Sequence, residues 1–336
     1  MRSIDPATLS YRERHQLVLS GIAPRPIALV ATQDRQGRVN LAPFSFFNAF
    51  ASHPPIVAIG PAHSLRTMEP KDTLVNLLET GECTISVVTA RIAEQVNLAS
   101  AEYAPGVDEF VKAGLTKRPS QRVRPPGVAE SPYIMECVLL EHIPLARDRG
   151  GNGNLVILEV VLFHVAESVF VEGRIDPNRM QLVGRLGYDW YCHAFGEALR
   201  KIPRPVGCGI GVDALPEPIR RSPILTGEDL ALLASVEQLP EPEPGFPSFP
   251  EGISADDVEI ELAAGEPLRA LYALLQSPVE GEQRWIMLQR IARGFLQQRR
   301  VREAWQTLLL QPGVASAQSA TASTTESAAA ARRAPQ

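Results

Sequence analysis

The sequence contains no run of apolar residues long enough to form a helix across a bilayer. It opens with charged residues and lacks the apolar segment of a secretory signal. Its four cysteines are widely spaced and form no Cys-x-x-Cys pair. This pattern predicts reduced thiols and argues against a zinc site or a disulfide framework. We therefore expect a cytoplasmic protein with no membrane partner.

Positive charge is not in excess either. A net charge of −5 over 336 residues gives no electrostatic reason to expect nucleic acid as a partner. The six histidines show no metal-ligand spacing, so no metal site is predicted. The sequence also lacks the Gly-x-Gly-x-x-Gly fingerprint of dinucleotide-binding folds and the nucleophile elbow of hydrolases. The catalytic residues are therefore unknown at this point.

The composition that remains is that of a globular chain. Apolar residues make up 45% and charged residues 21% of the sequence, and the length allows one large domain or two smaller ones. Composition changes near residue 200, because ten prolines fall within residues 203–250. Proline interrupts helices and sheets, so we predict a domain at 1–202, an extended segment at 203–266, helices at 267–311 and a disordered tail at 312–336.

The most informative stretch runs from residue 25 to residue 73. Residues 27–32 are short, apolar and rich in β-branched side chains, which predicts a strand, and Asp34 to Gly37 supply a turn. A second extended run covers residues 40–48 and is interrupted by Pro43. Proline cannot donate within a sheet, so this run is expected at an edge or a bulge with backbone amides left unpaired. A ligand can form main-chain hydrogen bonds at such a place.

A short helix is predicted directly after this stretch, over residues 73–79. Asp72 suits its N-cap, Leu74, Leu77 and Leu78 form its apolar side, and Gly81 ends it. A helix N-terminus offers free N–H groups and the positive end of a dipole. Lys71, Thr73 and the local backbone are thus suited to receive a phosphate, while the charge of Asp72 favours a capping role for that residue.

Four segments in this order resemble the flavin reductase-like family of FMN-binding split barrels, the flavoredoxin-like branch in particular. They are Pro24-Arg25-Pro26-Ile27, the run from Asn40 to Asn48, Pro54-Pro55 and Lys71-Asp72-Thr73. The resemblance covers about residues 15–200 and implies a mainly β protein with helices (α+β), built on a six-stranded antiparallel barrel. It also implies one FMN per subunit and a homodimer with the flavin near the subunit interface.

The resemblance assigns cofactor-binding positions residue by residue. The positions expected at the FMN phosphate or ribityl chain are Ser45, Lys71 and Thr73. The positions whose strand is expected to line the isoalloxazine ring are Asn40, Ala42, Pro43 and Phe44. Two further polar contacts are expected at Thr32 and Asn48. Arg25 has two interpretations: it serves the phosphate or ring environment, or it fixes the start of the first strand.

Other segments complete the expected domain. Residues 133–146 and 154–166 are rich in Val, Ile and Leu and predict a hairpin of the barrel. Leu158 stands where family members commonly have glycine, which leaves open how closely a ligand or a partner subunit approaches this strand. The basic residues within 117–124 are either a solvated loop or a site for the phosphate of a nicotinamide cofactor.

The C-terminal part predicts two amphipathic helices. Pro267 begins the first, and the second spans about residues 282–310, where apolar side chains recur at helical spacing among several arginines. Two interpretations remain for them. They form a hairpin docked on their own barrel or on the partner subunit, or they present a basic helix to another protein.

Three functions are compatible with these features. In the first, the protein is an oxidoreductase that passes hydride or electrons from NAD(P)H through FMN to a flavin or a small acceptor. In the second, it is a flavoredoxin-like FMN electron carrier without a nicotinamide site of its own. In the third, it is a flavin-binding scaffold whose C-terminal helices serve a protein partner. A bound flavin supplies its own redox chemistry, which agrees with the lack of a catalytic motif.

Overall fold

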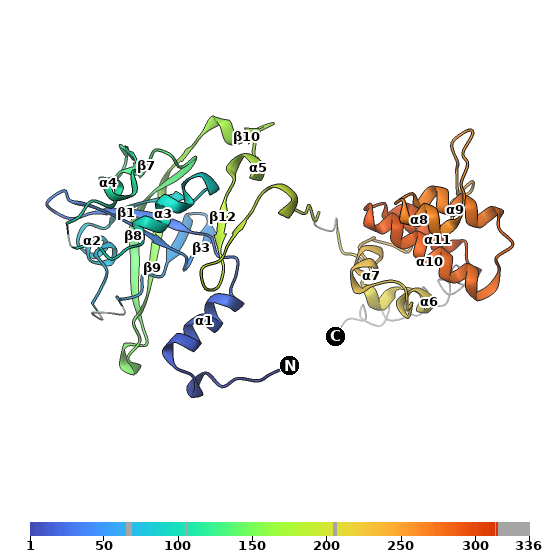
Figure 1. Cartoon of the computed structure of the whole chain (residues 1–336), viewed down its shortest axis with the longest axis horizontal. Helices are drawn as coiled ribbons and strands as arrows, with labels where there is room; N and C mark the ends of the chain where they lie inside the picture. Colours follow the sequence, from blue (N-terminus) through green and yellow to red (C-terminus); the bar gives the residue numbers. More distant parts are fainter. Residues whose placement is uncertain (65–68, 105, 204–206, 313, 315–336) are drawn as a thin grey trace, which may run out of the picture. The chain divides into compact units, whose positions relative to one another are not determined.

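The computed structural model describes residues 1–64, 69–104, 106–203, 207–312 and 314 (Figure 1). The chain forms two compact units, Met1–Lys201 and Ile202–Gln336, which are described separately below. Nearly all of the tail predicted at 312–336 lies outside the described residues. Among the helices that the structure describes, none combines the length and the apolar character that crossing a membrane requires.

The first unit is built on one antiparallel sheet with the strand order β2-β1-β5-β8-β9-β4-β3. This sheet confirms the predicted mainly β architecture with helices, although it contains seven strands where six were expected. Its strands are β1 (Ala28–Gln33), β2 (Val39–Phe44), β3 (Phe47–Ser52), β4 (Pro55–Ile59), β5 (Glu82–Val87), β8 (Tyr133–Leu145) and β9 (Gly153–Val165). Three two-stranded ribbons accompany it: β6 (Lys117–Arg118) with β7 (Gly127–Val128), β10 (Phe170–Val171) with β11 (Arg174–Ile175), and β12 (Val183–Arg185) with β13 (Tyr191–His193).

The order of the strands shows that the sheet curls. Its two edges are β2 and β3, and only Ser45 and Phe46 connect them. In a flat sheet of seven strands the edges would lie about 29 Å apart, at about 4.8 Å per neighbour. The connection from the last residue of β2 to the first of β3 reaches at most about 11 Å. The sheet therefore bends round until its edges approach each other, which is the form of a split barrel.

The helices of this unit are α1 (Tyr11–Gly21), α2 (Asp72–Thr80), α3 (Ala93–Ala99), α4 (Glu109–Ala113) and α5 (Pro177–Met180). Of these, α2, α3 and α4 lie against the sheet (Figure 1), whereas α1 has no buried residue. The apolar core has two clusters. One lies within the barrel and includes α2 through Leu74 and Leu77, while the other joins β1 to α3 and α4. Leu158, which replaces the common glycine, is fully buried in the first cluster.

Helix α2 differs from its prediction in two details. It begins at Asp72, so Lys71 and not Asp72 occupies the N-cap, with an extended backbone at φ −70° and ψ 151°. Leu78 was predicted on the apolar side but is 51% exposed, because Leu74 and Leu77 alone fill the contact with the barrel. Gly81 ends the helix as predicted, in the left-handed region at φ 72°.

The second unit is helical and has a core of its own. Its helices are α6 (Glu217–Arg220), α7 (Gly227–Leu233), α8 (Val258–Ala263), α9 (Pro267–Gln276), α10 (Gly281–Gln297) and α11 (Val301–Leu309). Residues 203–266, expected to be extended with at most a short helix within 216–230, contain the first three of these. Two of the prolines, Pro216 and Pro218, stand at the start of α6, where no N–H is needed. Leu215, Ile219 and Leu233 pack into the same core as α9 to α11.

The single helix predicted over 282–310 is wrong, because the chain breaks between α10 and α11. Arg299 adopts a left-handed conformation at φ 61°. The N–H of Arg299 bonds to the carbonyl of Leu296 at 2.9 Å, and the N–H of Arg300 bonds to that of Phe295 at 2.9 Å, which closes α10 with a Schellman-type end. This turn brings Phe295 and Trp305 into one core although they lie on different helices.

Candidate functional site

A pocket of about 290 Å³ opens between the edge strand β2, the first turn of α2 and the segment that follows α3. Five of the ten predicted cofactor residues line it: Asn40, Ala42, Pro43, Lys71 and Thr73. Its other walls come from Leu41 and from residues that the sequence did not single out, among them Ser64, Glu102, Tyr103 and Glu109. We refer to it below as the β2–α2 pocket.

Two side-chain hydrogen bonds fix α2 against the sheet at this pocket. Asn40 donates from Nδ2 to Thr73 Oγ1 at 2.8 Å, which joins β2 to the first turn of α2. Asn76 donates from Nδ2 to Thr32 Oγ1 at 3.1 Å, which joins the same helix to β1. Thr32 is fully buried behind the pocket and is not part of its lining, so in this structure it supports α2.

The start of α2 leaves backbone donors free. The side chain of Lys71, in the N-cap, makes no capping bond, and its carbonyl accepts the N–H groups of Leu74 and Val75. Among the described residues, the backbone N–H groups of Asp72 and Thr73 have no hydrogen-bond partner. Lys71 is exposed, with Nζ 6.0 Å from the ring centroid of Phe44. Free N–H groups at a helix start beside an ammonium group fit the phosphate of FMN.

The edge of β2 presents acceptors to the pocket. The N–H of Leu41 donates to Glu109 Oε2 at 2.9 Å and thus points away from β1. Because residues two apart on a strand point the same way, the main-chain groups of Pro43 also face the open edge. Pro43 has no N–H and that of Leu41 is taken, so the edge offers the carbonyl oxygens of these two residues. The sequence predicted free backbone amides at this edge, whereas the structure presents backbone carbonyls there.

Glu109, at the start of α4, is a buried lining residue that the sequence did not single out. It is 8% exposed, and burial raises the pKa of its carboxyl, with further contributions from the charges of Asp72 and Asp108, while the bond from Leu41 opposes the rise. An acidic pair before an apolar run is a signal in the sequence, but the same pattern is typical of any helix start. Because Glu109 and Leu41 are 68 residues apart in the sequence, local patterns give no sign of their contact.

Replacement of Glu109 by glutamine should make the free energy of unfolding less dependent on pH. The folded-state pKa of Glu109 is raised above its ordinary value of 4.5, so between these two values the folded state binds more protons than the unfolded state. Stability contributed by this group is present below pH 4.5 and is lost as pH rises through the folded-state pKa. Urea unfolding at a series of pH values should show Glu109→Gln gaining stability relative to wild type across that window. A constant difference would contradict the raised pKa.

The remaining predicted residues lie outside the lining of the β2–α2 pocket. Arg25 is 4% exposed, and its guanidinium donates to the carbonyls of Leu19 at 2.5 Å, Ile22 at 2.6 Å and Leu186 at 3.0 Å, and to Ser45 Oγ at 3.3 Å. These bonds support the interpretation in which Arg25 fixes the start of the first strand. Phe44 is buried in the barrel core, and Asn48 is exposed on β3, where its side chain accepts the N–H of Ala49.

The basic run at 117–124 is held down on the sheet by acidic side chains. The fully buried carboxylate of Glu136 accepts the N–H groups of Gln121 at 2.8 Å, Arg122 at 2.6 Å and Val123 at 3.2 Å. Arg124 forms an ion pair with Glu82 at 3.0 Å, and Lys117 forms one with Asp108. These contacts favour the solvated-loop interpretation over a site for a nicotinamide cofactor.

Comparison with known proteins places this fold among flavin-related oxidoreductases. The sequence model of the flavin reductase like domain matches residues 20–179. An uncharacterized protein of Halalkalibacterium halodurans is 37% identical over 190 residues, which is 56% of this chain and 90% of that protein.

Two solved structures agree with this match. Nitrilotriacetate monooxygenase component B of Bacillus cereus has 33% identity and a TM-score of 0.56, over 60% of this chain and 98% of that one. The 2-nitrobenzoate 2-nitroreductase NbaA of Pseudomonas fluorescens has 27% identity and a TM-score of 0.54, over 61% of this chain and 98% of that one. The matched domain ends at residue 179, before the helical unit begins.

Proposed function

Because this chain belongs to the flavin reductase-like family, we propose that it binds FMN in the β2–α2 pocket and passes electrons from NADH or NADPH to a flavin or a small acceptor. The start of α2 carries this proposal. It places Lys71, and two backbone N–H groups that have no partner among the described residues, beside the edge strand β2. The bond between Asn40 and Thr73 fixes the spacing between β2 and α2. The monooxygenase component and the nitroreductase named above support an oxidoreductase role.

Each part of the pocket has a task in this proposal. Bound FMN supplies hydride and electron transfer. The N–H groups of Asp72 and Thr73, with the ammonium of Lys71, would hold its phosphate, and the carbonyls of Leu41 and Pro43 would be available as acceptors for the ring system. Glu109 keeps the N–H of Leu41 occupied, so the edge strand stays in one position when the ligand enters. The chain thus binds and orients the flavin.

Anaerobic mixing separates the proposed reductase from an electron carrier. The FMN-loaded protein is mixed with NADH or with NADPH while flavin absorbance is recorded. We expect bleaching by at least one of the two donors at a rate well above that of free FMN at the same concentration. Bound FMN that is reduced no faster than free FMN would instead favour the flavoredoxin-like carrier.

Lys71→Ala should weaken FMN far more than riboflavin. If the ammonium forms a charge-assisted bond with the phosphate, its loss costs about 1.5–3 kcal/mol, and more than tenfold in Kd. Riboflavin has no phosphate, so its Kd should stay nearly unchanged. Fluorescence titration of the flavin-free protein measures both constants. Lys201→Ala, which alters an exposed lysine outside the pocket, is the matched control. An equal loss for the two flavins in Lys71→Ala would make Lys71 a structural residue.

We also propose that the protein is a homodimer. The edge strand β3 is exposed along nearly its whole length, and Phe46 and Phe50 beside and within it are 41% and 67% exposed. An apolar sheet edge of this kind is suited to contact with a second subunit. Light scattering at micromolar concentration should give twice the chain mass, and Phe50→Lys should reduce it. A monomeric mass for the wild-type protein would refute the proposal.

A further inference from the structure

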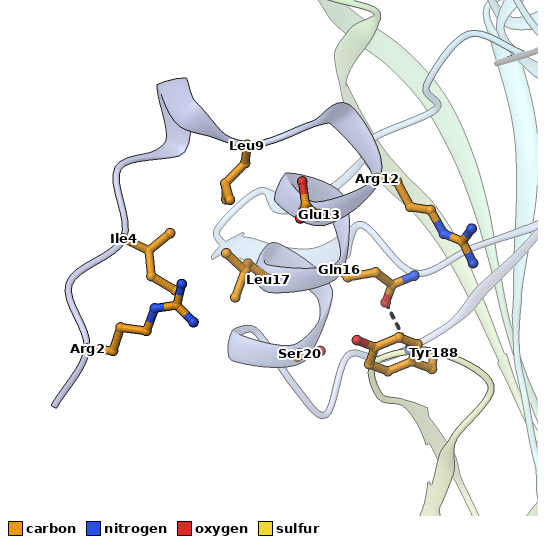
Figure 2. Close-up of a pocket in the computed structure, with 9 residues that line it drawn as sticks. All are labelled: Arg2, Ile4, Leu9, Arg12, Glu13, Gln16, Leu17, Ser20 and Tyr188. Carbon is orange, nitrogen blue, oxygen red and sulfur yellow. Dashed lines mark hydrogen bonds between the residues drawn. The ribbon is translucent and has the colours of Figure 1, made fainter.

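A second pocket, of about 370 Å³, lies beside α1 near the N-terminus (Figure 2). It opens between α1, the loop at Tyr188 and an N-terminal arm formed by residues 1–10, and it shares no lining residue with the β2–α2 pocket. Its size falls within the range of roughly 300–1,000 Å³ that is typical of small-molecule sites. We refer to it as the arm pocket.

Hydrogen bonds fix part of the wall of the arm pocket. Arg14 holds residues 6–9 of the arm to α1 by donating to the carbonyl of Pro6 at 3.2 Å and to that of Leu9. Ser10 and Glu13 form a capping box where the arm enters the helix. On the other wall, the backbone N–H of Tyr188 donates to Gln16 Oε1 at 3.3 Å.

The loop before Tyr188 also lies tightly against α1. A Cβ placed on Gly187 would be 2.3 Å from Ser20 Oγ and 3.2 Å from Ser20 Cα, so a side chain at this position would displace Ser20. The loop and the helix thus form a continuous wall, and the ring of Tyr188 is presented at its surface with 62% of the residue exposed.

The arm pocket combines positive charge with apolar surface. Arg2 and Arg12 line it, and within the described part of the chain neither guanidinium has a hydrogen bond or an ion pair. Glu13, the acidic residue in the lining, is bonded to Ser10 through one carboxylate oxygen at 2.6 and 2.9 Å. Figure 2 shows Arg2 reaching from the arm toward Leu17, and Arg12 beside Gln16 and Tyr188. Leu17 is 48% exposed within this setting.

From this combination we propose that the arm pocket binds an aromatic carboxylate. A carboxylate pairs with the planar fork of an arginine, and an aromatic body covers the exposed surface of Leu17, Ile4 and the Tyr188 ring. A neutral ligand forms no charge-assisted bond with either guanidinium, and a small inorganic anion leaves the apolar surface exposed. The chemistry of the walls thus selects a ligand with both features.

Calorimetric titration of the full-length protein with 2-naphthoate tests this site. We expect binding with a Kd below about 1 mM. The double variant Arg2→Gln/Arg12→Gln should weaken it about tenfold to a hundredfold, because charge-assisted bonds are lost. The neutral analogue 2-naphthamide should bind wild type at least tenfold more weakly than 2-naphthoate does. Arg91→Gln, which removes an exposed arginine outside the pocket, should bind 2-naphthoate as wild type does.

Any of four results would overturn the assignment. The first is unchanged 2-naphthoate affinity in the double arginine variant, and the second is equal affinity for the amide. The third is displacement of 2-naphthoate by saturating FMN, which would place it in the β2–α2 pocket. Decanoate is titrated as well, because tighter binding of this aliphatic carboxylate than of 2-naphthoate would contradict an aromatic ligand. All substituted positions are on the surface, so circular dichroism of each variant should match wild type.

Discussion

Glu136→Ala should destabilise the barrel unit by about 3–5 kcal/mol. The carboxylate of Glu136 is fully buried and accepts four hydrogen bonds, three from the backbone at 121–123 and one from His164 Nε2 at 2.6 Å. Alanine would leave these donors unpaired inside the protein, and the loop at 121–123 would lose its attachment to β8. Hydrogen exchange of amides in β8 and β9, followed by mass spectrometry, measures the change within this unit.

Glu130→Ala is the matched control for this substitution. Glu130 also accepts a backbone N–H, that of Thr116, at 3.0 and 3.1 Å, but at a solvent-exposed position. Its removal should cost at most about 1.5 kcal/mol. Equal effects of the two substitutions would show that the network at Glu136 contributes no more than an exposed hydrogen bond.

Protonation of Glu136 should lower the free energy of unfolding of the barrel unit in acid. Burial raises the pKa of Glu136, but the hydrogen bonds from His164, Gln121 and Arg122 outweigh it and lower the pKa below its ordinary value of 4.5. Its contribution is therefore present above pH 4.5 and is lost as pH falls through the folded-state pKa. The difference in stability between wild type and Glu136→Ala should shrink over that acidic range.

Trp305→Ala should destabilise the helical unit by about 3–5 kcal/mol. Trp305 is fully buried at the centre of the core formed by α6 to α11, and its Nε1–H donates to the carbonyl of Leu233 at 3.0 Å. Alanine would create a large cavity and leave this carbonyl unpaired. Hydrogen exchange of amides in α7, α10 and α11 should report the loss, while β8 and β9 serve as an internal reference.

Two other substitutions separate packing from hydrogen bonding at this position. Trp305→Phe keeps most of the ring volume but removes the N–H, so a smaller loss of about 1–3 kcal/mol is expected. Trp190→Ala makes the same change as Trp305→Ala at a residue that is 71% exposed, and it should alter stability by less than about 0.5 kcal/mol. A loss at Trp190 as large as that at Trp305 would contradict the burial argument.

Local patterns predicted part of the barrel. The strands β8 and β9 end within one residue of their predicted limits, because long runs rich in Val, Ile and Leu and a glycine-rich connection are strong local signals. The single run predicted over 40–48 is divided between β2 and β3. The break between α10 and α11 was missed because apolar side chains keep a helical spacing across it. Only the left-handed conformation of Arg299 reveals the turn, and no glycine marks it in the sequence.

The candidate site was predicted only where neighbouring residues in the sequence form it. The run from Asn40 to Pro43 and the start of α2 line the pocket, and both are continuous segments that the family resemblance and their own local patterns indicated. Glu109 and Glu136 were not found, because their partners lie in other segments and a buried carboxylate resembles a surface one in the sequence. Thr32 and Ser45 lie outside the pocket lining, and their side chains bond to protein groups, Asn76 and Arg25.

Hydrogen exchange of the flavin-free protein, measured with and without saturating FMN, tests most directly whether the β2–α2 pocket holds this cofactor. The amides of Asp72 and Thr73 have no partner among the described residues, so they should exchange rapidly alone and become protected when the phosphate binds. Riboflavin should leave these two amides unprotected, and neither flavin should change α1 or α10. FMN that fails to bind, or that protects other segments while Asp72 and Thr73 exchange as before, would contradict the proposed site.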